Sequence, residues 1–169
     1  MDPARLVTQL AATPAAVRAM LHGVTPEQAR WRPGREKWSM LEVLCHLGDE
    51  ERQDFRMRLK LVIESEDAPW PEIDPAGWVK SRDYNGRDLA QSLKEFERER
   101  ADSLKWLSGL RHRRWDVTHQ HPGLGALRAG DLLAAWCAHD LLHLRQLANV
   151  RLALLEQDAA PYSLRYAAP

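Results

Sequence analysis

The amino-acid sequence predicts an all-α protein folded as a four-helix bundle. Apolar residues recur at helical spacing through most of the chain, two capping-box patterns mark helix starts, and prolines and glycines collect between the helical segments. Amphipathic helices of this kind bury their apolar faces against one another, and four long ones form a bundle. The length of 169 residues is typical of one domain, so we expect a single domain over residues 1–169.

The first predicted helix carries apolar residues at helical spacing: Leu6, Val7, Leu10, Val17, Met20, Leu21 and Val24. Thr13-Pro14 interrupts this pattern. Because proline has no amide donor, we expect either a kink or a fresh helix start with Thr13 as the N-cap. Thr25-Pro26-Glu27-Gln28 then combines a capping box with a proline at the first helical position, which predicts one more short turn of helix.

A second capping box, Ser39-Met40-Leu41-Glu42, begins the clearest helix, which we expect to run to about Ser65. Its apolar face consists of Leu41, Leu44, Leu47, Phe55, Leu59 and Ile63. The stretch from Asp67 to Gly86 is rich in proline and glycine, which predicts a long crossover between the second and third helices. Its aromatic residues, Trp70, Trp78 and Tyr84, indicate that the crossover packs against the bundle.

The third predicted helix runs from about Arg87 to Ser108, and Gly109 follows as a plausible C-terminal stop. Its apolar stripe consists of Leu89, Leu93, Phe96, Leu104 and Leu107. The helical pattern fails between Arg111 and Gly130, where residues 121–125 (His-Pro-Gly-Leu-Gly) predict a turn. The last helix has Asp131 in its first turn and is expected to continue to about Glu156.

Composition argues against several classes of protein. Lys+Arg and Asp+Glu are balanced at 24 each and no basic stripe is present, so we expect no nucleic-acid partner. The N-terminus lacks a signal-peptide pattern, and no apolar run approaches the roughly 18 residues that span a bilayer, so we expect no membrane association. Two cysteines do not make a disulfide framework, which favours a cytoplasmic protein.

Three histidines form the candidate metal site. His139 and His143 are four residues apart on the last predicted helix, so both imidazoles lie on one helix face. His46 lies on the second helix, where it borders the predicted bundle interior. Three imidazoles can hold one divalent ion and leave coordination positions open, but they do not select among zinc, nickel, copper and iron. Spacing alone leaves open that these are ordinary core histidines, because the stronger His-Glu-x-x-His pattern is absent.

Several polar residues near these histidines are candidates for supporting roles. Asp49, Glu50, Asp140 and Gln146 are candidates to accept the outer imidazole N–H groups. Asp49 and Glu50 are also the first candidates for a catalytic acid or base. The two cysteines, Cys45 and Cys137, are rotated away from the histidine face, so we expect small buried side chains rather than metal ligands.

Three further features lie outside the metal-site pattern. Arg100 falls on the apolar stripe of the third helix, so it either pairs with Asp49 or Glu50 or extends outward to solvent. His119-Gln120-His121 is expected to form an exposed loop at the rim of a cleft. Trp136, three residues before His139, is the tryptophan that could line the site.

Two segments carry a resemblance to a known family. Residues 38–51, from Trp38 to Glu51, resemble the second-helix signature of the DinB-like superfamily of bacterial proteins, and residues 136–147 resemble its last-helix signature. The turn at residues 121–125 and the crossover residues Trp78, Arg82, Tyr84 and Asn85 are also similar to the family. The resemblance implies that His46, His139 and His143 bind a divalent metal, with zinc, nickel or iron as candidates, inside a four-helix bundle.

The same resemblance implies a class of reaction. The superfamily includes thiol-dependent transferases and isomerases that use bacillithiol, mycothiol or glutathione. We therefore expect a metal-dependent thiol S-transferase or a related hydrolase, with a low-molecular-weight thiol as cosubstrate and a small molecule as substrate. The competing expectation is a non-enzymatic, metal-stabilised protein with a stress-related binding role. Homodimerisation through an exposed helix face is a further possibility that the sequence leaves open.

Overall fold

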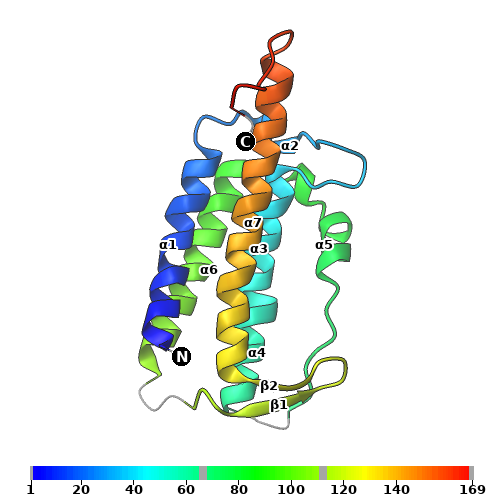
Figure 1. Cartoon of the computed structure of the whole chain (residues 1–169). Coiled ribbons are helices and arrows are strands. Elements are labelled where there is room, and N and C mark those ends of the chain that lie inside the picture. The colour runs from blue at the N-terminus through cyan, green and yellow to red at the C-terminus, as the bar shows by residue number, and fades with distance from the viewer. Residues whose placement is uncertain (1, 65–67, 111–113, 168–169) are drawn as a thin grey trace.

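The computed structural model describes residues 2–64, 68–110 and 114–167, and it shows long helices packed side by side (Figure 1). The long segments are α1 (Pro3–Leu21), α3 (Met40–Glu50) with its continuation α4 (Arg56–Glu64), α6 (Leu89–Gly109) and α7 (Ala129–Asp158). Helix α1 contacts α6 and α7, and α3 contacts the same two helices, so the four segments surround a common core. The predicted all-α four-helix bundle is confirmed. The expected boundaries at Ser65, Asp67 and Arg111 lie outside the described residues.

Helix α1 continues through Pro14, so the predicted fresh start at Thr13 is wrong. Asp2 is the N-cap instead, and Thr13 is buried with its hydroxyl donating to Asp140 Oδ2 at 2.7 Å. Proline removes the amide that would donate to the carbonyl of Leu10, four residues earlier. Arg100 Nη1 donates to that carbonyl at 2.8 Å, so a side chain from α6 supplies the hydrogen bond that the proline cannot.

Both predicted capping boxes are present. Thr25 caps the short helix α2 (Pro26–Arg30), and Ser39 caps α3, where its hydroxyl accepts from the amide of Glu42 at 3.1 Å and the Glu42 carboxylate accepts from the Ser39 amide at 2.8 Å. Beyond α3 the backbone widens into the π-helical turn η1 (Glu51–Phe55), in which the Arg56 amide donates to the Glu51 carbonyl. This turn interrupts the regular helix predicted from the apolar pattern.

The crossover between α4 and α6 contains structure of its own. Asp74 caps the short helix α5 (Pro75–Ser81), and the 3₁₀ turn η2 (Tyr84–Gly86) follows it. Tyr84 is fully buried, and its hydroxyl donates to Asp49 of α3 at 2.7 Å. The prediction that this segment packs against the bundle is therefore confirmed, although it is more regular than a loop.

A β-hairpin connects α6 to α7, where the sequence predicts only a turn. Strands β1 (Thr118–His121) and β2 (Gly125–Arg128) pair antiparallel, and Gly125 at the turn has a φ of +73°. His119 is buried and its ring stacks on Trp70 with centroids 4.4 Å apart. The prediction of an exposed loop at His119-Gln120-His121 is therefore wrong at His119. The sequence did not predict the two strands because four residues are too few to show a clear alternation of apolar and polar side chains.

The core of the described residues contains three apolar clusters, and polar residues lie between the two larger ones. One of these two includes Val17, Leu47, Phe96 and Leu147, and the other includes Leu10, Leu59, Leu107 and Trp136. Each long segment has a buried polar residue that lies in sequence between members of these two clusters: Thr13, Glu51, Arg100 and Asp140. None of the described helices has the length and apolar character that a bilayer-spanning segment requires.

Candidate metal centre

Three imidazoles from two helices converge at one point of the bundle. His46 projects from α3, while His139 and His143 project from successive turns of α7. The Nε2 atom of His139 lies 3.3 Å from Nε2 of His46 and 3.0 Å from Nε2 of His143. One nitrogen from each of the three histidines lies within 4.8 Å of the others, so the structure brings together all three predicted metal ligands.

The spacing of the three nitrogens fits a small divalent ion. Zinc binds imidazole nitrogen at about 2.0–2.1 Å in tetrahedral geometry, so two such nitrogens should lie about 3.3 Å apart. The two measured separations, 3.3 and 3.0 Å, are close to this value. Three unprotonated nitrogens at this spacing repel one another unless a proton or a cation lies between them. The residues present therefore fit a divalent metal.

The hydrogen bond of His143 fixes the tautomer that such a site needs. Its Nδ1 lies 2.8 Å from Oε1 of Gln146, an acceptor, so Nδ1 carries the proton and Nε2 keeps its lone pair. Gln146 thus has the role predicted for it. The Nδ1 atom of His46 is buried and has no hydrogen-bond partner among the described residues. The His46 ring is held instead by the edge of Trp38, with centroids 4.8 Å apart.

Burial also keeps two of the histidines neutral. It lowers the pKa of His46 to about 4, and it lowers the pKa of His143 to about 4 with a smaller contribution from His139. Neutral imidazole is the form that binds metals. At neutral pH both rings are therefore already in the ligand form, so ion binding there requires no loss of protons.

Glu50 contacts two of these three nitrogens rather than an outer imidazole N–H. Its Oε2 lies 2.9 Å from Nε2 of His139 and its Oε1 lies 3.7 Å from Nε2 of His46. Burial alone would raise the pKa of Glu50, but the hydrogen bond with His139 and the attraction of the histidines hold it below its usual value. The carboxylate is therefore ionised, and it adds negative charge where a cation would bind.

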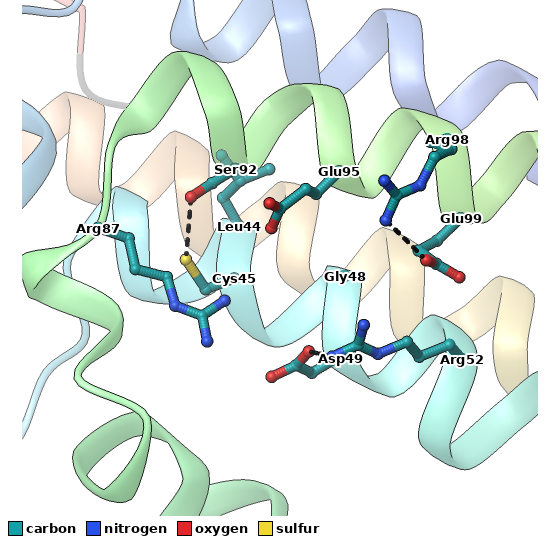
Figure 2. A pocket seen from close by; sticks show the side chains of 10 residues that line it. All are labelled: Leu44, Cys45, Gly48, Asp49, Arg52, Arg87, Ser92, Glu95, Arg98 and Glu99. Atoms are coloured by element: carbon teal, nitrogen blue, oxygen red, sulfur yellow. Dashed lines mark hydrogen bonds and ion pairs between the residues drawn. The ribbon is translucent and has the colours of Figure 1, made fainter.

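Asp49, the other candidate acid, contacts a different set of residues. Its carboxylate accepts from Arg82 Nη1 at 2.6 Å, from the Tyr84 hydroxyl at 2.7 Å and from Arg52 Nη2 at 2.8 Å. Figure 2 shows Asp49 beside Arg52 in a cavity of about 20 Å³ between α3 and α6, which is room for a single water. The geometry favours Glu50 over Asp49 as an acid or base, and a catalytic role for either stays a prediction.

Both cysteines are buried, as predicted, and neither belongs to the histidine group. The Cys45 thiol lies 3.5 Å from the Ser92 hydroxyl at the edge of the cavity in Figure 2, and burial raises its pKa. The Cys137 thiol lies 3.4 Å from the carbonyl of Leu6, and burial raises its pKa to about 11. Protonated thiols in these positions are packing residues.

Next to the histidines lies a second polar cluster, centred on Arg100. This side chain is 1% exposed, and it donates from Nε to Glu51 at 2.9 Å and from Nη1 and Nη2 to Asp140 at 2.6 and 2.9 Å. The predicted partners, Asp49 and Glu50, and the outward orientation are therefore both wrong. Glu51 begins the π-helical turn, and Asp140 accepts from Arg100 and Thr13 rather than from the outer imidazole nitrogens for which it was a candidate.

Aromatic rings surround the histidines on two sides. Trp38 stacks parallel to His143 with centroids 6.2 Å apart, and Phe55 lies 4.9 Å from His139. Trp136, which we expected to line the site, is buried and donates from its indole nitrogen to Glu51 at 3.1 Å. Its ring stacks on Phe55, with centroids 5.6 Å apart, and Phe55 in turn lies beside His139. Trp38 was not predicted as a site residue, because its position just before a capping box gives no such signal.

Comparison with known proteins agrees with the helical bundle described above. YfiT from Bacillus subtilis, described as a probable metal-dependent hydrolase with an unusual four-helix bundle topology, is similar in structure with a TM-score of 0.80. The likeness covers 90% of this chain and 87% of that chain at 18% sequence identity, so it shows the fold alone. No curated protein sequence matches at a significant level. The model of the DinB superfamily matches residues 9–147, which is most of the chain, and the protein therefore belongs to the DinB superfamily.

Proposed function

We propose that the protein binds one divalent metal ion through His46, His139 and His143 and uses it in a transferase or hydrolase reaction on a small molecule. The observation that carries the proposal is the convergence of three imidazole nitrogens, two pairs of which lie 3.0 and 3.3 Å apart. The ionised Glu50 beside them supplies the negative charge that a cation attracts. Membership of a superfamily that contains a probable metal-dependent hydrolase supports the same class of chemistry.

A divalent ion with three imidazole ligands and an open position supplies Lewis acidity, which lowers the pKa of a water or a thiol at that position. The residues of the chain have complementary tasks. Gln146 fixes the His143 tautomer, and Trp38 and Phe55 hold the rings. Glu50, whose Oε2 lies 2.9 Å from Nε2 of His139, would accept a proton from a nucleophile bound at this centre.

We further propose that a low-molecular-weight thiol is the natural nucleophile, with hydrolysis as the related alternative. Both thiol cysteines of the chain are buried and held protonated, so neither serves as an internal nucleophile. With neither cysteine available, we propose that the nucleophile comes from solution, either as a thiol or as water. Glutathione, bacillithiol and mycothiol are the thiols to compare in the first assay.

Metal content is the first measurement. Protein purified without a metal-affinity tag should contain about one equivalent of zinc, nickel or iron by elemental analysis. His139→Ala should abolish stoichiometric binding, whereas His22→Ala, which changes an exposed histidine at the end of α1, should leave it intact. A His139→Ala protein that keeps a full equivalent of metal would show that the site is assigned to the wrong residues.

Turnover is the second measurement, and it separates the enzymatic proposal from the alternative. Glu50→Gln should keep the metal but lose on the order of 10²–10⁴-fold in kcat, which is the usual contribution of a general base. Gln91→Glu on the exposed side of α6 is a matched control that should keep full activity. Stoichiometric metal without turnover of any thiol or ester substrate would favour the non-enzymatic, metal-stabilised role.

A further inference from the structure

A pocket lies where the β-hairpin meets the start of the crossover, at the end of the bundle where Figure 1 shows β1 and β2. It has a volume of about 600 Å³ and is lined by Arg58 of α4, residues 69–73 of the crossover and residues 119–122 of the hairpin. Pockets of about 300–1,000 Å³ are the size that holds small molecules in proteins. We call it the hairpin pocket. The residues that line it are distinct from the three histidines of the metal centre.

One wall of the hairpin pocket is a stack of rings and a guanidinium that come from three segments. The rings of His119 and Trp70 lie parallel, with centroids 4.4 Å apart, and the edge of His121 lies 5.4 Å from Trp70. The guanidinium carbon of Arg58 lies 4.8 Å from the centre of the Trp70 ring. A cation–π contact of this kind holds the guanidinium in place without neutralising its charge.

The end of the Arg58 side chain is open to a ligand. Its Nε lies 3.0 Å from Oδ1 of Asp54, and the side chain is 19% exposed. In the described part of the chain, neither Nη1 nor Nη2 of Arg58 makes a hydrogen bond. Two parallel N–H groups at the end of a guanidinium are the arrangement that binds a carboxylate in bidentate fashion.

Two more N–H donors lie at the hairpin pocket. The Nδ1 atom of His121 accepts from the amides of Gly123 and Leu124, both at 3.1 Å, so Nε2 of the neutral ring carries the proton and is a donor. The indole nitrogen of Trp70 is buried and has no hydrogen-bond partner among the described residues. Glu72, the acidic residue of the lining, is exposed. This excess of donors favours an anionic ligand.

Much of the remaining lining is apolar, and it consists of Pro69, Pro71, Ile73 and Pro122. Rigid proline rings and an isoleucine can contact an apolar body but offer no side-chain hydrogen bonds. Small-molecule pockets typically combine an apolar lining with a few polar groups that fix the orientation of the ligand. The combination fits an organic anion better than a bare inorganic one.

The hairpin pocket and the metal centre lie along the same helical segment. Glu50 contacts His139 at 2.9 Å, and Asp54 and Arg58 follow Glu50 at successive spacings of four residues. Side chains at this spacing are neighbours on a helix surface. Eight residues of helix cover about 12 Å, so one small organic molecule can extend from Arg58 to the histidines.

From this lining we propose that the hairpin pocket binds a small organic carboxylate. Arg58 holds the carboxylate through Nη1 and Nη2, and the prolines and Ile73 contact the apolar body of the ligand. The proposal deepens the function given above and rests on it for one point, that the molecule bound here is the substrate of the metal centre. The carboxylate of that substrate then lies at Arg58, and its reacting group lies at the histidines.

Binding of matched probes is the first test. Naphthoate and naphthamide have the same rings and differ in the negative charge, and isothermal titration calorimetry at neutral pH measures both affinities. Naphthoate should bind about 10–100-fold more tightly, which is the usual effect of hydrogen bonds to a charged group. Inorganic phosphate has the charge but no apolar body, so it should bind more weakly than naphthoate. No binding of naphthoate, equal binding of naphthamide, or phosphate binding as tight as that of naphthoate would overturn the proposal.

Variants of α4 then test the role of Arg58. Arg58→Met should weaken naphthoate binding about 10–100-fold. Lys60→Met is the matched control, because it removes the same charge from the same helix but Nζ of Lys60 lies over Trp106 of α6. It should leave the affinity unchanged. Asp54→Asn keeps Arg58 and removes the carboxylate that competes for it, so it should bind naphthoate more tightly. Weaker binding by Asp54→Asn, or unchanged binding by Arg58→Met, would contradict the proposed contact.

Nitrogen-15 NMR of the tryptophan indoles places the ligand. Naphthoate should shift the Trp70 signal, which the variant Trp70→Phe identifies, and should leave the signal of Trp106 in place. The same titration with chelator-treated wild type and with His139→Ala separates this proposal from the proposed function. Naphthoate binding that survives in both proteins supports the hairpin pocket even if no turnover is found. Binding that is lost in both would mean that the carboxylate binds the metal, and it would overturn the proposal.

Discussion

Two polar clusters lie next to each other in this bundle and are built from neighbouring residues. Glu50 and His139 belong to the histidine cluster, whereas the following residues on the same two segments, Glu51 and Asp140, belong to the arginine cluster around Arg100. Both clusters use residues of α7, and the arginine cluster adds residues of α1 and α6. They differ in whether their hydrogen bonds are complete.

The arginine cluster is complete without any ligand. Arg100 donates to Glu51, to both oxygens of Asp140 and to the Leu10 carbonyl. Trp136 donates to the second Glu51 oxygen, and Thr13 donates to Asp140 Oδ2, which also accepts from Arg100. The histidine cluster brings nitrogen lone pairs and the Glu50 carboxylate to one point, and supplies no cationic side chain of Lys or Arg among its described contacts. The first arrangement stabilises the fold, and the second gathers nitrogen and oxygen atoms that could hold a divalent cation.

The largest loss in the free energy of unfolding is expected when Arg100 is replaced. Arg100→Met leaves two buried carboxylates and the Leu10 carbonyl without their donor, and such a loss costs about 3–5 kcal/mol. Urea unfolding followed by circular dichroism measures the change. Arg100→Lys keeps the charge but loses the planar fork, so it should cost less and should still bind metal. A free energy of unfolding for Arg100→Met within about 1 kcal/mol of wild type would contradict the structural role.

The control for this variant lies two residues earlier on the same helix. Arg98 is largely exposed, and it contacts Glu99 at 3.2 Å. An exposed ion pair contributes about 0–1 kcal/mol, so Arg98→Met should leave the midpoint of urea unfolding almost unchanged.

The second-largest expected effect is an increase in the free energy of unfolding when zinc is added, and it should depend on the histidine cluster. Zinc added to chelator-treated protein should raise the free energy of unfolding by about 2.7 kcal/mol when free zinc is 100 times its Kd, because the ion binds the folded state preferentially. Thermal or urea unfolding at fixed zinc concentrations measures this increase. His143→Ala should abolish most of it and Arg100→Lys should keep it. Equal stabilisation of wild type and His143→Ala would mean that zinc binds elsewhere.

A smaller loss in the free energy of unfolding is expected when one hydrogen bond of the arginine cluster is removed and the others are kept. Thr13→Val removes the hydroxyl that donates to Asp140 at 2.7 Å and preserves the shape of the side chain. A hydrogen bond to a charged group contributes about 1.5–3 kcal/mol, so urea unfolding should show a loss in this range. Thr8→Val, on the exposed side of α1, is the matched control and should cost less. Equal losses for the two variants would show that the contact with Asp140 adds nothing.

The same comparison shows what can be predicted from the sequence. The capping boxes at Thr25 and Ser39, the helical stripes and the three histidines follow local rules of spacing, and the structure agrees with each of them. Local rules fail where a partner lies far away in the chain. From the sequence alone, Pro14 predicts a break in the helix. The hydrogen bond that Arg100 donates to the carbonyl of Leu10 becomes apparent only in the folded structure.

The partners of Arg100 were also assigned to the wrong residues. Asp49 and Glu50 are buried in the regular helix α3, but Glu51, the residue that pairs with Arg100, begins the π-helical turn that runs to Phe55. The chain gives no proline or glycine signal in this segment. The hairpin was missed for a different reason, because its buried His119 is held by stacking on Trp70 rather than by an apolar alternation.

The smallest expected effect is a shift in the pKa of Asp54. This residue lies beyond Glu50 on the same segment and pairs with Arg58 at 3.0 Å. Burial raises the pKa of Asp54 from 3.8 to about 6, and the negative charge of Glu50 adds to this while Arg58 opposes it. A raised pKa in the folded state means that Asp54 favours folding below pH 4. That contribution declines as the pH rises from about 4 and is fully lost above about 6, because the unfolded chain releases the proton first.

A cation held by the histidines would favour the ionised form of Asp54 and lower its pKa. Carbon-13 NMR of the Asp54 carboxyl, titrated with and without zinc, should therefore show a midpoint near pH 6 in the chelated protein and a lower one with zinc. The His139→Ala protein should show no zinc-dependent change. A midpoint that zinc leaves unmoved in the wild-type protein would place the ion away from the histidine cluster, since a divalent charge there acts on every nearby buried carboxyl.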